Sequence, residues 1–329
     1  MNTNAFASDV LYDAALGQEF NALTPENAMK WSEVQPQMAA PAVYGPADAM
    51  VQFAHAQGMA VRGHTLVWNL QYPGWVDTLG SAAAQRDALH AHITDEVSHF
   101  AGKIAQWDVV NEAFEGNDVY KHDVWYNAFG GPAYIADAFI WAHEADPQAQ
   151  LYYNDFGDDD VDSVHGLAVL NMVRDLVAQG VPIDGVGLQM HEGGPGGVSP
   201  SVLQHAFQTY NGITNFRGQP LGVAITEMDV PLPLTTTQVQ LTGIAPENEL
   251  EAQAATYGTA LYACLGATRC TDFTVWGVDD RTAAAGSPAV VAGRPLPINS
   301  GGSVGAPVLL NTVDVPKPAL NYMVQILGS

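Results

Sequence analysis

The sequence predicts an α/β fold of the (β/α)₈-barrel type, in which parallel strands alternate with helices around one core. Two observations favour this class. Short apolar runs alternate with helical patterns along the whole chain, and polar side chains follow several of the apolar runs directly. The length of 329 residues fits one barrel or two ordinary domains. No linker, repeat or charge block divides the chain, so we expect a single barrel domain over 1–329.

Seven strands are expected, each a short apolar run bounded by turn residues. They are residues 20–23, 60–68, 104–111, 151–154, 186–191, 223–227 and 272–276. A closed barrel needs eight strands, and the missing one should precede the others, near residues 1–6. That stretch is short and polar, so the first strand is expected to be truncated or degenerate.

Helical periodicity and capping residues separate the strands. The expected helices are residues 47–57, 81–100, 132–145, 164–178, a helix opening at 199–200, and 247–265. Ser81 is the expected cap of its helix, and Ser199 precedes a proline at the first helical position. Residues 281–312 are rich in Gly, Pro, Ala and Ser and predict a long loop.

The charge balance excludes some partners. The chain has 35 acidic and 11 basic residues and a net charge of −24, which argues against a nucleic-acid partner. The acidic excess indicates a solubilising surface or adaptation to salt. No run of about 18 apolar residues exists, so no membrane span is expected. No charged-then-apolar leader opens the sequence, so a signal peptide is not expected within it.

Cysteine usage indicates the redox setting. Cys264 and Cys270 are the two cysteines of the chain, and they do not form a Cys-x-x-Cys pattern. A local disulfide that closes a short loop is favoured over two buried free thiols. Such a bond points to an oxidising, extracellular environment.

Metal-binding patterns are weak. The ten histidines form no His-Glu-x-x-His or similar set, so no catalytic metal and no cofactor are expected. The run Asp158-Asp159-Asp160 lies just past a strand end and is compatible with calcium. A solvated loop with helix-capping aspartates is the favoured interpretation.

Two apolar runs end in glutamates. Asn111 and Glu112 close the run at 104–110, and Glu227 closes the run that begins at Gly222. In a barrel of parallel strands, these C-terminal strand ends meet at one face. A pair of carboxyl groups there, one protonated and one ionised, suits glycoside hydrolysis. Capping of the following helix by Asn111-Glu112 is the structural alternative.

Other strand ends carry groups that complement such a pair. His191 ends a strand and is expected to hydrogen-bond Glu227 and keep it ionised, with Asp229 two residues beyond. A satisfied core histidine is the alternative for His191. Further polar and aromatic side chains suit sugar hydroxyls and rings, although a solvated helix turn or a core tryptophan would also explain them. They are Glu26, Asn27, Lys30, His64, Trp68, Gln71 and Trp276.

Taken together, these stretches resemble glycoside hydrolase family 10, the retaining endo-β-1,4-xylanases. The motifs occur in the family's order, and the similarity spans about residues 9–325. The substrate-binding signatures lie at 20–31 and 62–68, the acid/base segment at 107–113, the nucleophile segment at 225–229, and further matches at 189–191, 274–278 and 316–319.

The resemblance implies roles for individual residues. Glu112 would be the acid/base and Glu227 the nucleophile of a double displacement with retention, with His191 and Asp229 supporting Glu227. The residues implied to bind xylose units are Glu26, Asn27, Lys30, His64, Trp68, Gln71, Asn111, Gln189, His191 and Trp276. Cys264 and Cys270 stand where many secreted members have a disulfide. The implied protein is a secreted monomer that acts on xylan or xylo-oligosaccharides and needs no metal.

The chain departs from the family pattern at several positions, as a divergent member would. Asn69 replaces a usual histidine, and Phe156 replaces a frequent tyrosine near the leaving-group side. Residues 281–284 replace a usual Ser-Trp pair. These departures leave three alternatives to a xylanase: a related retaining β-glycosidase with altered specificity, a barrel that binds xylan without cutting it, and an unrelated metal-dependent barrel hydrolase.

Overall fold

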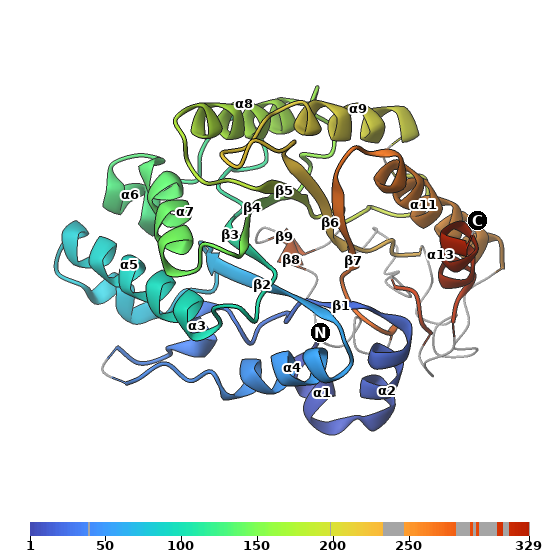
Figure 1. The fold of residues 1–329 in the computed structure, drawn as a ribbon, viewed down its shortest axis with the longest axis horizontal. Helices are drawn as coiled ribbons and strands as arrows, with labels where there is room; N and C mark the ends of the chain where they lie inside the picture. Colours follow the sequence, from blue (N-terminus) through green and yellow to red (C-terminus); the bar gives the residue numbers. More distant parts are fainter. Residues whose placement is uncertain are drawn as a thin grey trace.

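Seven parallel strands surround a common axis in the computed structural model, and helices cover their outside (Figure 1). The structure describes residues 1–328 except 39, 198, 233–246, 281–289, 292–293, 296–307 and 312–315. The strands are β1 (Ala22–Leu23), β2 (Ala60–Val67), β3 (Gln106–Asn111), β4 (Gln150–Asp155), β5 (Gly185–Leu188), β6 (Gly222–Met228) and β7 (Cys270–Val275). Each pairs in parallel with the next along the chain. The predicted barrel class is therefore confirmed.

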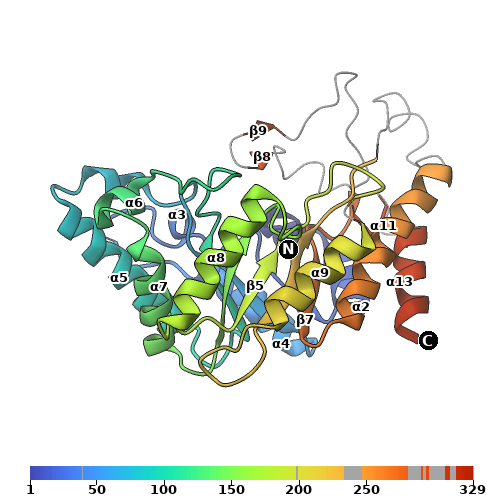
Figure 2. The same ribbon diagram turned by 90° about the horizontal axis from the view of Figure 1, so that it is seen from above.

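The helices alternate with these strands (Figure 2). They are α1 (Thr3–Ser8), α2 (Val10–Glu19), α3 (Trp31–Val34), α4 (Gly45–Ala56), η1 (Gly74–Thr78), α5 (Ala82–His99), α6 (Val124–Phe129), α7 (Ala133–Ala145), α8 (Val164–Ala178), α9 (Pro200–Asn211), α11 (Glu247–Gly266) and α13 (Pro318–Gly328). A short antiparallel pair, β8 (Val290–Val291) and β9 (Arg294–Pro295), lies beyond one end of the barrel. Residues 308–311 of the expected loop at 281–312 are also described, and its other residues lie outside the described part of the chain. No helix in the described residues has the length and apolar character needed to cross a membrane.

Capping residues fix the helix starts where the sequence predicts them. The Ser81 side chain accepts a hydrogen bond from the Ala84 amide, 3.1 Å away, and opens α5. The Ser199 side chain does the same for α9, accepting from the Val202 amide at 3.3 Å. Each contact satisfies an amide that a helix start leaves without an intrahelical partner.

The expectation that the first strand is truncated or degenerate near residues 1–6 is confirmed. The Asn2 side chain accepts hydrogen bonds from the amides of Asn4 and Ala5 and starts helix α1 instead. Only Met1 continues the strand arrangement: its amino group donates to the Thr24 carbonyl at 2.5 Å, and its carbonyl accepts from the Glu26 amide at 3.0 Å. In the described residues β1 and β7 do not pair with each other, and a cavity of about 550 Å³ lies between them. The barrel is therefore closed by strand pairing from β1 round to β7, and the gap in pairing lies between these two strands.

Glycines in the strands make room for large side chains inside the sheet. A Cβ on Gly63 of β2 would lie 2.2 Å from the Trp107 ring, and a Cβ on Gly185 of β5 would lie 2.2 Å from the Tyr152 ring. No side chain larger than hydrogen fits at that separation, so neighbouring strands pack directly on these aromatic rings.

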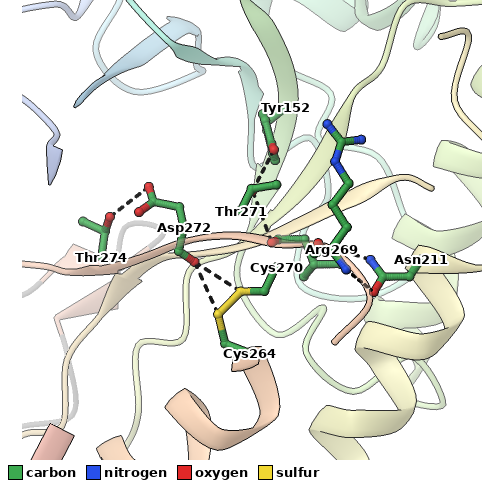
Figure 3. The surroundings of a disulfide bond; sticks show 9 residues. Tyr152, Asn211, Cys264, Arg269, Cys270, Thr271, Asp272 and Thr274 are labelled. Atoms are coloured by element: carbon green, nitrogen blue, oxygen red, sulfur yellow. Dashed lines mark hydrogen bonds between the residues drawn. A yellow bond between two sulfur atoms is a disulfide. The ribbon is translucent and has the colours of Figure 1, made fainter. Parts of the chain in front are cut away.

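A disulfide joins Cys264 near the end of α11 to Cys270 at the start of β7 (Figure 3). The predicted local disulfide is therefore confirmed. Both sulfur atoms lie beside the Asp272 carbonyl of the same strand. The bond ties the longest helix of the second half directly to the last barrel strand.

One buried carboxyl group gives a stability prediction. Glu96 of α5 is fully buried, its oxygens have no hydrogen-bond partner in the described residues, and His92 Nε2 lies 3.6 Å away. Burial, with a smaller contribution from Asp95, raises the Glu96 pKa well above its usual range. The folded state therefore holds a proton that the unfolded chain releases above about pH 4.3, so this group lowers stability as pH rises beyond that point.

Replacing Glu96 with glutamine is therefore expected to leave Tm nearly unchanged near pH 4 and to raise stability at pH 7, by roughly 1–3 kcal/mol. Thermal unfolding at both pH values measures this. The exposed Glu144 of α7 provides the matched control Glu144→Gln, which should move Tm little at either pH. A fall in Tm at pH 7 for Glu96→Gln would show that the carboxylate is paired in the native state.

Candidate active site

The two predicted glutamates lie at the C-terminal ends of β3 and β6, with β4 and β5 between them. Glu112 directly follows β3, and Glu227 lies near the end of β6. Both are buried, with 4 % and 5 % of their surface exposed. Between them, β4 contributes Asn154 and the end of β5 leads to Gln189. These four residues therefore belong to one end of the same sheet.

Hydrogen bonds join the two carboxyl groups through three amide side chains. Gln189 donates to Glu112 Oε1 at 3.2 Å, and Asn154 donates to Glu227 Oε1 at 2.8 Å. The same two amides both donate to Asn111 Oδ1, at 3.1 and 2.9 Å. Asn111 thus lies at the centre of a network that ends in a carboxyl group on either side. The structure brings the predicted residues Asn111, Glu112, Gln189 and Glu227 together in it.

The surroundings of Glu227 favour its ionised form. His191 Nε2 lies 3.2 Å from Glu227 Oε2, and His64 Nδ1 lies 3.8 Å from Oε1. Burial alone would raise the Glu227 pKa, but these two imidazoles and Asn154 lower it to about 2. His191 Nδ1 in turn lies 3.1 Å from Asp229 Oδ2. Although burial opposes it, Asp229 and Glu227 raise the His191 pKa well above its usual range, which favours the positively charged imidazolium.

Glu112 has a different set of contacts. Trp68 donates its indole hydrogen to Glu112 Oε2 at 3.1 Å, and the Lys121 ammonium donates to the same oxygen at 3.2 Å. Gln189 donates a hydrogen bond to the other oxygen, Glu112 Oε1. The Glu112 backbone has a φ of 55°, in the left-handed region that non-glycine residues rarely adopt. This conformation turns the chain away from the β3 direction at the carboxyl group.

A cluster of donors and acceptors lies beside the carboxyl pair. The Lys30 ammonium donates to Gln71 Oε1 at 2.7 Å and to Asn27 Oδ1 at 3.3 Å, and it lies 4.7 Å from the centre of the Trp68 ring. Burial lowers the Lys30 pKa to about 8, although Glu227 and other nearby acids oppose this. The structure thus places this predicted cluster close enough to Glu227 for its carboxylate to interact electrostatically with the Lys30 ammonium.

Trp276 and Glu26 complete the predicted set. The half-buried Trp276 ring follows β7 and packs edge-on against His64, with ring centres 5.3 Å apart, and lies 6.4 Å from the His191 ring. It therefore flanks Glu227. Glu26 lies 3.7 Å from the amino group of Met1 and accepts a hydrogen bond from the Asn2 side chain. Its carboxylate thus contacts residues 1 and 2.

The sequence did not reveal three parts of this site. Asn154 follows the apolar run 151–153 as Asn111 follows its own run, so the sequence carried a signal for Asn154. Lys121 lies outside any strand or helix pattern, and the only signal was the scarcity of lysine, with four in the chain. Arg62 and Asp108 form a buried ion pair within the barrel, with Arg62 Nε 3.0 Å from Asp108 Oδ1.

The surroundings of Asp158, Asp159 and Asp160 differ from the predicted solvated loop. Asp158 and Asp159 are buried, with 0 % and 8 % exposed, so the expected solvated loop is wrong there. Ser163, not an aspartate, caps the following helix by accepting from the Gly166 amide. Across the residues that the structure describes, no group of three or more His, Cys, Asp or Glu side chains is placed to hold a metal ion.

A carboxylate held ionised and a second carboxyl group, joined across the mouth of a parallel barrel, define a glycoside hydrolase. The chain belongs to glycosyl hydrolase family 10, which matches residues 1–326. It is 39 % identical over 277 residues to a protein named Beta-1,4-xylanase from Dictyoglomus thermophilum, covering 82 % of this chain and 74 % of that one.

Solved structures agree with this membership. Native xylanase 10B from Thermotoga maritima superposes with a TM-score of 0.85 at 32 % identity, covering 100 % of this chain and 93 % of that one. Xylanase 10B from Thermotoga petrophila in complex with xylobiose gives the same TM-score and identity, covering 100 % and 92 %. The resemblance predicted from the motifs is therefore confirmed.

Proposed function

We propose that this chain is a retaining endo-β-1,4-xylanase in which Glu227 is the nucleophile and Glu112 the acid/base. The observation that carries the proposal is the unequal environment of the two carboxyl groups. Glu227 faces His191 and His64 and has a pKa of about 2, whereas Glu112 accepts hydrogen bonds from Trp68, Lys121 and Gln189 and faces no imidazole among the described residues. An ionised nucleophile beside a second carboxyl group is the arrangement that double displacement requires.

In the first step, a carboxylate oxygen of Glu227 attacks the anomeric carbon of the sugar. The bond from that carbon to the leaving oxygen breaks while Glu112 gives its proton to that oxygen. In the second step, Glu112 takes a proton from water, and the water oxygen displaces Glu227 from the anomeric carbon. The configuration is inverted twice and is therefore retained.

Side chains beside the two carboxyl groups suit sugar hydroxyls. Gln189 Oε1 is buried and accepts no hydrogen bond within the described part of the chain. Lys30, Asn27 and Gln71 present donors and acceptors beside Glu227. The Trp276 ring offers a surface for stacking.

The relatives support xylan as the substrate. Their names are those of β-1,4-xylanases, and one solved relative contains xylobiose. A related β-glycosidase with altered specificity is less well supported, because both glutamates and His191 lie in segments that match the family's motifs. A barrel that only binds xylan does not need a carboxylate with so low a pKa.

Release of new reducing ends from xylan tests the proposal. We expect internal cleavage by the parent protein, with products that shorten progressively from long chains. Turnover of aryl glycosides other than xylosides, with xylan left intact, would favour the altered-specificity alternative. Retention on insoluble xylan without any product would favour the binding protein.

Because burial lowers the Lys30 pKa to about 8, we expect the binding of xylo-oligosaccharides to depend on pH. The Lys30 cation makes stronger hydrogen bonds to hydroxyl groups than the neutral amine does, and it is lost as pH rises through about 8. Affinity for a xylo-oligosaccharide should therefore fall across that pH range. Calorimetry at pH 6.5 and 9.5 measures this, and Lys30→Met should bind more weakly at pH 6.5 with little further loss at pH 9.5. An identical pH dependence in both proteins would contradict the assignment.

The remaining expectations concern partners and location. We expect a monomer that binds no nucleic acid, since acidic residues outnumber basic ones by 35 to 11. We also expect secretion, which the Cys264–Cys270 disulfide supports because such bonds persist in oxidising compartments.

A further inference from the structure

Lys121 is a buried cation that contacts the proposed acid/base and has no role in the mechanism above. It is 7 % exposed, and its ammonium lies 3.2 Å from Glu112 Oε2. Its other neighbours are Asn69 Oδ1 at 3.4 Å and the Phe156 ring, whose centre is 6.0 Å away. Asn69 and Phe156 are two of the positions at which the chain departs from the family pattern, and both contact this one side chain.

A short hairpin fixes Lys121 relative to Glu112. The Lys121 amide donates to the Ala113 carbonyl at 2.8 Å, and Phe114 pairs antiparallel with Tyr120, with stacked rings 4.3 Å apart. The Ala113 amide donates to the Tyr153 hydroxyl of β4 at 3.0 Å, which anchors the hairpin to the barrel. The hairpin thus brings the backbone of Lys121 back beside Ala113, next to Glu112. Its ammonium group therefore reaches Glu112 from a neighbouring, hydrogen-bonded segment.

The position of the ammonium matters for proton transfer. When Glu112 gives its proton to the leaving oxygen, negative charge develops on its carboxyl group. A fixed positive charge at 3.2 Å stabilises that charge as it forms, and the side chain needs no rearrangement. Trp68 shares Oε2 with Lys121, but its indole carries no charge, so it cannot replace this contribution.

We propose that Lys121 is a positioning residue that holds the Glu112 carboxyl group in place and stabilises the charge it gains on proton transfer. The inference rests on the proposed function, because it assigns Lys121 a part in a step that Glu112 performs. A cavity of about 280 Å³ adjoins Lys121, Asn69 and Glu115, so an arginine has room at position 121.

Leaving-group dependence separates this role from a general structural one. A dinitrophenyl leaving group departs with little need for protonation, whereas an unsubstituted phenyl group depends on the acid. For Lys121→Met we expect kcat/KM on phenyl β-xylobioside to fall by about 10- to 100-fold, the factor that corresponds to one lost charged hydrogen bond. On dinitrophenyl β-xylobioside it should fall by less than about threefold. Lys121→Arg should recover most of the loss.

The control is Lys103→Met, which removes an exposed lysine that precedes β3, whereas Glu112 follows the opposite end of this strand, and both rates should stay at the parent level. Thermal unfolding of each variant establishes that it is folded. Equal losses on both substrates, or no loss on either, would overturn the role of Lys121. If the parent turns over neither xylobioside, the proposed function itself fails, and the role of Lys121 fails with it.

Discussion

Glu227→Ala is expected to lower kcat/KM on xylan by about 10⁴- to 10⁶-fold, the loss typical of removing a covalent nucleophile. The physical reason is that no other group can replace it. His191, His64 and Asn154 all direct charge or hydrogen bonds at the Glu227 carboxylate. Initial rates of reducing-end release measure the loss. The isosteric Glu227→Gln keeps the shape of the site and should be nearly as inactive, since it lacks the charge.

Glu112→Ala provides the matched comparison, because a lost general acid or base costs less, about 10²- to 10⁴-fold. Added azide should distinguish the two variants. With Glu112→Ala, azide attacks the glycosyl-enzyme and should give a β-xylosyl azide. With Glu227→Ala, it attacks the β-linked substrate directly and should give the α-azide. Exchanged products would mean that the two roles are reversed.

Asp108→Asn is expected to destabilise the fold by about 3–5 kcal/mol, since it leaves a buried guanidinium without its counter-charge. Arg62 and Asp108 are 2 % and 1 % exposed, and Arg62 Nε lies 3.0 and 3.1 Å from the two carboxylate oxygens. Asp108 also lies 3.0 Å from His64 Nδ1. Denaturant unfolding measures the stability change, and kcat/KM should also fall, because His64 loses the group that orients it beside Glu227.

The double variant Arg62→Met with Asp108→Leu separates these two effects. It removes both charges, so stability should recover relative to Asp108→Asn. Activity should stay low, because His64 still lacks its partner. An Asp108→Asn protein as stable as the parent would show that the Arg62 charge finds another partner inside the barrel.

Much of this site was predictable because strand ends in a parallel barrel meet at one face. Apolar runs ending in Asn111-Glu112 and in Glu227 identified the two carboxyl groups, and parallel pairing brings them together whatever lies between them. Helix starts such as Ser81 were predictable because capping is a local interaction.

The contacts that the sequence did not reveal depend on tertiary distances. Lys121 reaches Glu112 only because a hairpin folds back on Ala113, and no periodicity encodes that return. Asp158 looks solvent-exposed in a run of three aspartates, but packing buries it completely. Near residues 1–6 the sequence predicted a truncated or degenerate strand, but not the helix that Asn2 caps in its place.

Trapping the covalent intermediate tests the central claim most directly. Dinitrophenyl 2-deoxy-2-fluoro-β-xylobioside forms the glycosyl-enzyme readily but releases it slowly, so the adduct accumulates for peptide mass spectrometry. We expect one fluoroxylobiosyl group per molecule, on the peptide containing Glu227 and attached to that carboxylate. Active enzyme that forms no adduct, or that carries it on another residue, would contradict the account.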